Sequence, residues 1–94
     1  MTRVELTELA RQDLDSLIRT RELPVSTHDR VERVVEQLRS FPLSGQLVGG
    51  RYPASRSISV AWGWLVLHYV YDEEADRVYI IGVVDGRTRS APHP

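Results

Sequence analysis

Two stripes of apolar residues at helical spacing run through the first part of the chain. In the first stripe, apolar residues recur every three or four positions, at Leu6, Leu9, Ala10, Leu14, Leu17 and Ile18. Polar and charged residues occupy the opposite side of the same segment. Thr7 is a suitable N-cap residue, because its hydroxyl can accept a hydrogen bond from the first helical turn. The pattern predicts an amphipathic helix from Thr7 to near Thr20.

The second stripe follows a break at Leu23-Pro24, since the residue before a proline is disfavoured in a helix. Its apolar positions are Val31, Val34, Val35, Leu38 and Phe41. Ser26, with Asp29 three positions later, resembles a capping box, and Pro42 ends the pattern. Two helices joined by so short a segment should form an antiparallel hairpin.

The second half of the sequence changes from helical spacing to alternation. Glycines and Pro53 indicate a loop from Leu43 to Ala54. Alternation after Ser55, a turn at Trp62-Gly63 and an acidic turn at 72–76 then predict three strands, the last two at 64–71 and 77–84. The last strand is apolar on both faces, so we expect it inside the sheet. We expect Val31, Val35, Leu38, Leu14 and Leu17 to be buried with Ile58, Val78, Ile80 and Val84, or with the neighbours of these strand residues on the alternate face.

Val4 to Leu6 is short and compatible with a strand, so the order is strand, helix, helix and then three strands. This order predicts an α+β fold in which an N-terminal strand and a helical hairpin pack on an antiparallel sheet. Residues 1–94 form one domain, with an irregular tail at 88–94. The hairpin covers one face of the sheet, and the other face is left for a partner.

Composition narrows the class of protein. The 94 residues contain no cysteine and no segment of signal-peptide or membrane-span character, so we expect a cytoplasmic protein. The three histidines are scattered, and neither a metal site nor a cofactor is expected. All twelve basic residues are arginines, whose forked guanidinium suits phosphate and carboxylate groups. The net charge of −1 lacks the basic excess usual for a nucleic-acid-binding domain.

The ordered motifs resemble the RelE/ParE superfamily of toxins from type II toxin–antitoxin systems. The resemblance covers about residues 1–89 and rests on Val4-Glu5-Leu6-Thr7, Ala10, Asp13-Leu14, Leu38-Arg39-Ser40-Phe41-Pro42, Gly45, Arg56, the segment from Trp64 to Asp72, and the segment from Arg77 to Arg87. It implies a toxin bound by a cognate antitoxin. RelE-like members cleave mRNA in the translating ribosome, whereas ParE-like members inhibit DNA gyrase.

The residues at the positions of RelE catalytic groups favour the ParE-like branch. RNA cleavage needs groups that move protons and stabilise the phosphorane. Leu65 stands where the resemblance places a catalytic Arg, Ile58 where it places a Lys, and Asp85 where other nuclease members keep a His. We therefore expect a gyrase inhibitor, with a ribosome-dependent mRNA endonuclease as the alternative.

Candidate site residues follow from both branches. For binding the target or the antitoxin they are Arg51, Arg56, Trp64, Tyr79, Asp85 and Arg87. If the chain is RelE-like, the catalytic set is Arg56, Arg87 and His93. Plainer interpretations stay open: Arg87 as a solvated charge at the strand end, Arg56 as an arginine with its head in water, and the tyrosines as cross-strand packing residues.

Overall fold

The computed structural model describes residues 1–49 and 52–89. Its elements in chain order are β1 (Arg3–Leu6), α1 (Glu8–Thr20), α2 (Thr27–Ser40), β2 (Gln46–Gly49), β3 (Tyr52–Ala61), β4 (Leu65–Asp72), β5 (Arg77–Asp85) and α3 (Gly86–Arg89). The five strands form one sheet in the order β1-β5-β4-β3-β2, with β1 parallel to β5 and the other neighbours antiparallel. The predicted α+β fold is confirmed, and β5 lies inside the sheet as expected.

The two long helices begin in different ways. Thr7 caps α1 as predicted, because its Oγ1 accepts a hydrogen bond from the backbone N–H of Ala10 at 3.3 Å. The predicted capping box at Ser26 is wrong. Ser26 has right-handed helical angles and its side chain makes no cap bond. Instead, the carbonyl of Pro24 accepts from the N–H of Thr27 at 3.0 Å, so a backbone turn starts α2.

Two boundaries differ from the sequence prediction. The segment predicted as a loop contains β2, which pairs with β3 around Gly49, a glycine with a φ of +73°. β2 is an edge strand whose Leu47 and Val48 are largely exposed, so burial imposes no alternation on it. At the other end, α3 takes in positions 88 and 89, which had been assigned to an irregular tail.

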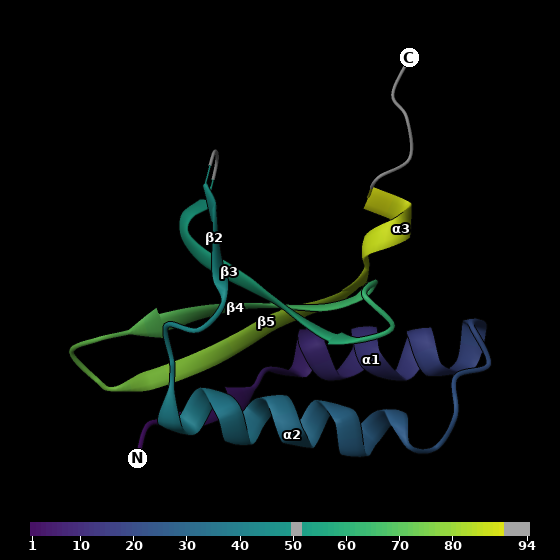
Figure 1. Ribbon diagram of the computed structural model, residues 1–94, viewed down its shortest axis with the longest axis horizontal. Helices are drawn as coiled ribbons and strands as arrows, with labels where there is room; N and C mark the ends of the chain where they lie inside the picture. The colour runs from purple at the N-terminus through teal and green to yellow at the C-terminus, as the bar shows by residue number, and fades with distance from the viewer. Residues whose placement is uncertain (50–51, 90–94) are drawn as a thin grey trace.

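Both long helices cover the same face of the sheet (Figure 1). The β2–β3 hairpin and α3 rise on the other side, and we call the sheet face between them the open face (Figure 1). The core between the helices and the sheet contains Ala10, Leu14, Val31, Val34, Leu38, Leu65, Leu67, Tyr69, Val78, Ile80 and Val83. Val66, His68 and Val70 alternate with the buried residues of β4 and therefore line the open face.

A β-bulge in β5 changes which side chains reach the core. Tyr69 pairs with Ile80 and His68 pairs with Gly82, so Ile81 is the extra residue. The bulge brings Val83 to the core face in place of its neighbour Val84, whereas Val78 and Ile80 are buried as first expected. The carboxylate of Asp13 on α1 accepts the N–H of Val83 at 3.2 Å, and this bond fastens the bulge to the helix.

Candidate functional site

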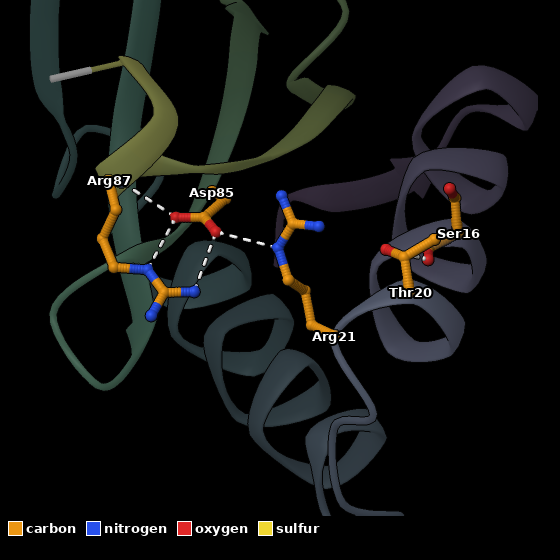
Figure 2. Close-up of polar contacts among 5 residues, drawn as sticks. All are labelled: Ser16, Thr20, Arg21, Asp85 and Arg87. Atoms are coloured by element: carbon orange, nitrogen blue, oxygen red, sulfur yellow. Dashed lines mark hydrogen bonds and ion pairs between the residues drawn. The ribbon is translucent and has the colours of Figure 1, made fainter. Parts of the chain in front are cut away.

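A buried carboxylate marks the end of β5. The side chain of Asp85 is only 5% exposed, yet three donors of Arg87 reach it: the backbone N–H at 2.9 Å, Nε at 3.1 Å and Nη2 at 2.9 Å. Arg21, the residue that ends α1, donates its Nε from the other side at 3.2 Å. Figure 2 shows the carboxylate held between the two guanidinium groups. This forked arrangement is the geometry in which arginine binds a carboxylate most strongly.

The charges in this cluster stabilise one another. Hydrogen bonds from Arg87, helped by the one from Arg21, outweigh the effect of burial and hold the pKa of Asp85 well below its usual range. The same hydrogen bond raises the pKa of Arg87. Asp85 and Arg87 therefore both stay ionised at neutral pH, where neither can act as a proton shuttle.

Stacked aromatic and guanidinium groups extend the cluster. The guanidinium carbon of Arg87 lies 3.7 Å from the ring centroid of Trp64, which stacks on Trp62 with centroids 5.4 Å apart. Arg30 of α2 lies 5.3 Å from the centroid of Trp62. We call Arg30, Trp62, Trp64 and Arg87 the Arg–Trp stack. Contacts of this kind fix the direction in which an arginine points.

A tight turn positions the two tryptophans. Trp62 and Gly63 both have positive φ, at 56° and 74°, as a two-residue hairpin turn of right-handed twist requires. The N–H of Trp64 donates to the carbonyl of Ala61 and closes this turn. The carbonyl of Trp64 accepts from the N–H of Gly86 at 2.6 Å, which joins the turn to the start of α3. The local backbone thus places Trp64 beside Arg87.

The structure brings together three of the candidate residues, Trp64, Asp85 and Arg87. Arg56 lies elsewhere, where its Nη1 donates to the carbonyls of Leu43 and Gly45 at 3.3 and 2.9 Å. Tyr79 is half-buried in the middle of the sheet, opposite Val70 and Glu5. Arg51 and His93 lie outside the described residues.

Arg56 and Tyr69 fasten the segment between α2 and β2. Tyr69 is fully buried, and its hydroxyl donates to the carbonyl of Pro42 at 2.9 Å and accepts from the N–H of Gly45 at 2.8 Å. A Cβ on Gly45 would lie 2.7 Å from that hydroxyl oxygen, so only glycine fits. Tyr69 therefore does more than the cross-strand packing expected of it.

Sequence reasoning missed Arg21 and Arg30 as members of the site. Arg21 stands 64 positions before its partner Asp85, and no local motif links the two. Arg30 looks like an ordinary exposed residue of an amphipathic helix until the turn at Trp62 is placed beside it. The only usable signal was the sequence Trp62-Gly63-Trp64, which predicts both the turn and a paired aromatic surface.

The chemistry available to the cluster is binding. Across residues 1–49 and 52–89, no group of three or more histidine, aspartate or glutamate side chains could hold a metal ion. In the same residues, no helix is both long and apolar enough to cross a bilayer. Two arginines around one carboxylate leave a net positive charge beside an exposed aromatic surface, which suits an anionic or polar partner.

Solved structures share this fold. A chain of the RelBE2 toxin–antitoxin complex from Mycobacterium tuberculosis aligns with a TM-score of 0.70 and 26% identity, over 89% of this chain and 96% of that chain. A chain of the intact Escherichia coli RelBE complex aligns with a TM-score of 0.68 and 17% identity, over 90% and 96%. The isolated E. coli RelE toxin gives 0.65 and 17%, over 90% and 84%. The fold is that of RelE/ParE superfamily toxins.

A family model assigns the chain to one family of this superfamily. The model of the ParE toxin of the type II toxin–antitoxin system parDE matches residues 4–89. The chain therefore belongs to the ParE toxin family, and it is a toxin of a type II toxin–antitoxin system. A search of curated proteins gave no match.

Proposed function

We propose that this toxin inhibits growth by binding DNA gyrase and that a cognate antitoxin neutralises it. The observation that carries the proposal is the state of Asp85 and Arg87. Asp85 is ionised at neutral pH and occupies the fork of Arg87, so neither side chain donates or accepts a proton near neutral pH. Binding a protein target needs no such group.

Two core residues support the same branch. Leu65, which stands where RelE-like toxins keep a catalytic Arg, is fully buried under the helices. Ile58, at the position of a catalytic Lys, packs against the same core. Both side chains are uncharged and pack on the core side, so neither position presents a cation on the open face.

A ribosome-dependent mRNA endonuclease is the second candidate. The similarity to a chain of the M. tuberculosis RelBE2 complex, at 26% identity over most of both chains, favours it. Under this candidate Arg56, Arg87 and His93 would form the catalytic set. The separation of Arg56 from Arg87 counts against direct cooperation between those two side chains.

The proposed antitoxin would cover the open face of the sheet. Two of the similar structures are toxin–antitoxin complexes. In this chain the two long helices cover only one face of the sheet (Figure 1). The apolar Val66, Val70 and Val84 are only partly buried on the other face. Apolar surface left on one side of a sheet is a common interaction site.

The test is expression of the chain without an antitoxin, with both targets examined. We expect induction of the DNA-damage response, filamentous cells and inhibited supercoiling by purified gyrase, while ribosome-bound mRNA stays intact. Arg87→Ala should reduce toxicity by weakening binding by about 1–3 kcal/mol, the range for a hydrogen-bonded charged contact. Arg19→Ala, in the exposed last turn of α1, is the matched control and should remain toxic.

Circular dichroism of both variants separates loss of binding from loss of folding. Codon-positioned cuts in translated mRNA, with gyrase unaffected and the cuts abolished by Arg87→Ala, would refute the gyrase proposal and establish the endonuclease.

A further inference from the structure

A second arginine cluster lies at the opposite end of β5. Arg3 and Arg77 are register partners in the parallel β1–β5 ladder, so their side chains project from neighbouring strands on the same face. The N–H of Thr2 donates to the carbonyl of Arg39 at 3.1 Å, which brings the end of α2 against the start of β1. Arg3, Arg39 and Arg77 line one pocket of about 500 Å³.

The pocket has more positive charge than its own acids balance. Glu5 is the acidic residue of its lining, and among the ion pairs of the described residues none joins it to an arginine. Arg39 pairs with the exposed Glu36 at 2.6 Å. With Arg39 paired to Glu36, Arg3 and Arg77 still leave positive charge at this pocket, which an anion would balance.

The guanidinium of Arg77 is not fully paired within the described residues. Nε of Arg77 is buried, and within the described part of the chain it has no hydrogen-bond acceptor. Buried donors almost always have a partner, because leaving a charged donor unpaired costs more than the bond itself contributes. An oxyanion in the pocket would relieve the repulsion among the arginines that line it.

We propose that Arg3, Arg39 and Arg77 form a binding site for a phosphate group, either free or carried by a small molecule such as a nucleotide. Three planar forks from three different elements suit a tetrahedral group with several acceptor oxygens better than a carboxylate with two. The volume exceeds that of one phosphate and falls in the range of small-molecule sites.

The site is separate from the Arg–Trp stack. Arg77 and Asp85 are eight positions apart on one strand, which corresponds to roughly 25 Å along β5. Phosphate binding would therefore leave the surface around Arg87 free. The inference does not depend on which cellular target the toxin has.

The first experiment titrates the ¹⁵N-labelled chain with inorganic phosphate and follows the arginine Nε–H signals by NMR. The Nε–H signal of Arg77 should shift in a saturable way. Arg77→Gln and Arg39→Gln should each weaken binding about tenfold or more, as loss of a charged hydrogen bond implies. Arg33→Gln, with the same charge change on an exposed position of α2, should leave the affinity within about twofold of the parent chain.

A change of opposite sign makes the test specific. Glu5→Gln removes the acid from the lining and should tighten phosphate binding. Glu8→Gln makes the same charge change outside the lining and is the control. Equal effects of the two substitutions would mean that binding depends only on the overall charge. Because Arg77→Gln could disturb folding, Arg39→Gln provides the second variant.

Ligand comparison identifies what the pocket takes. Equal affinity for phosphate and adenosine monophosphate supports recognition of the phosphate alone, and tighter binding of the nucleotide supports a nucleotide pocket. Acetate binding as tightly as phosphate, or an Arg77 signal unmoved by phosphate, would overturn the proposal.

Discussion

Replacing Tyr69 with phenylalanine should loosen the connection between α2 and β2 at a calculable cost. The substitution keeps the buried ring and removes only the hydroxyl. It leaves the carbonyl of Pro42 and the N–H of Gly45 without their partner. The buried N–H of Gly45 costs about 1–3 kcal/mol and the partly buried carbonyl of Pro42 about 1 kcal/mol, so the free energy of unfolding should fall by about 2–4 kcal/mol. A small domain has a stability of about 5–15 kcal/mol, so the variant should still fold.

Denaturant and thermal unfolding measure this cost. For a domain of this size each kcal/mol corresponds to about 4–8 °C, so the melting temperature should drop by roughly 8–32 °C. Tyr79→Phe is the matched control, since Tyr79 is a half-buried tyrosine of the adjacent strand and none of the hydrogen bonds within the described residues uses its hydroxyl. It should change stability by no more than about 0.5 kcal/mol.

A double-mutant cycle with Arg56→Ala extends the reasoning. Arg56 and Tyr69 hold the same segment, since Arg56 donates to the carbonyl of Gly45 and Tyr69 accepts from its N–H. Their effects should be non-additive by about 0.5 kcal/mol or more. If Tyr69→Phe costs as little as Tyr79→Phe, the hydroxyl of Tyr69 does not hold the segment. If the effects of Tyr69→Phe and Arg56→Ala simply add, the two residues do not hold it together.

Two further substitutions test the glycine at the same place and the buried carboxylate. Gly45→Ala places a Cβ 2.7 Å from the Tyr69 hydroxyl and 2.8 Å from the carbonyl of Ser57, so it should destabilise the fold by about 1–3 kcal/mol. Gly82→Ala is the control and should not destabilise it, because its Cβ would meet only an Asp13 oxygen at 3.5 Å. Because the folded pKa of Asp85 is depressed, its contribution to stability is present above the unfolded pKa of about 4 and is lost as the pH falls through the folded value. In denaturant titrations at a series of pH values, Asp85→Asn should therefore flatten the acid-side loss of stability below about pH 5; identical slopes in the two proteins would contradict the assigned role.

The sequence predicts the elements whose burial is one-sided. α1 and α2 each bury one stripe against the sheet, and apolar spacing shows that stripe directly. β2 was missed because it lies at the edge with its side chains exposed, so no pattern marks it. The β5 bulge could not be predicted either. It changes by one residue which side chains face the core, and a segment that is apolar on both faces has the same pattern with or without that change.

The site was predicted in part. Asp85, Arg87 and Trp64 were singled out one by one, from the resemblance and from the turn at Gly63. Their assembly depends on contacts between residues far apart in the chain, such as that of Arg21 with Asp85, which neither spacing nor composition encodes. Arg56 was selected by its place on a strand, but its charge is directed at backbone carbonyls that only the folded loop supplies.

The parallel pairing of β1 with β5 has a consequence for biosynthesis. Within the described residues the first strand pairs with the last one alone, and α1 is tied to the same strand through the bonds from Thr7 to Ile80 and from Val83 to Asp13. Contacts so distant in sequence must wait until both segments exist. A nascent or prematurely terminated chain that lacks residues 77–85 therefore lacks the strand on which β1 and α1 assemble. We expect such a truncated chain to be unfolded in its first half and open to proteolysis.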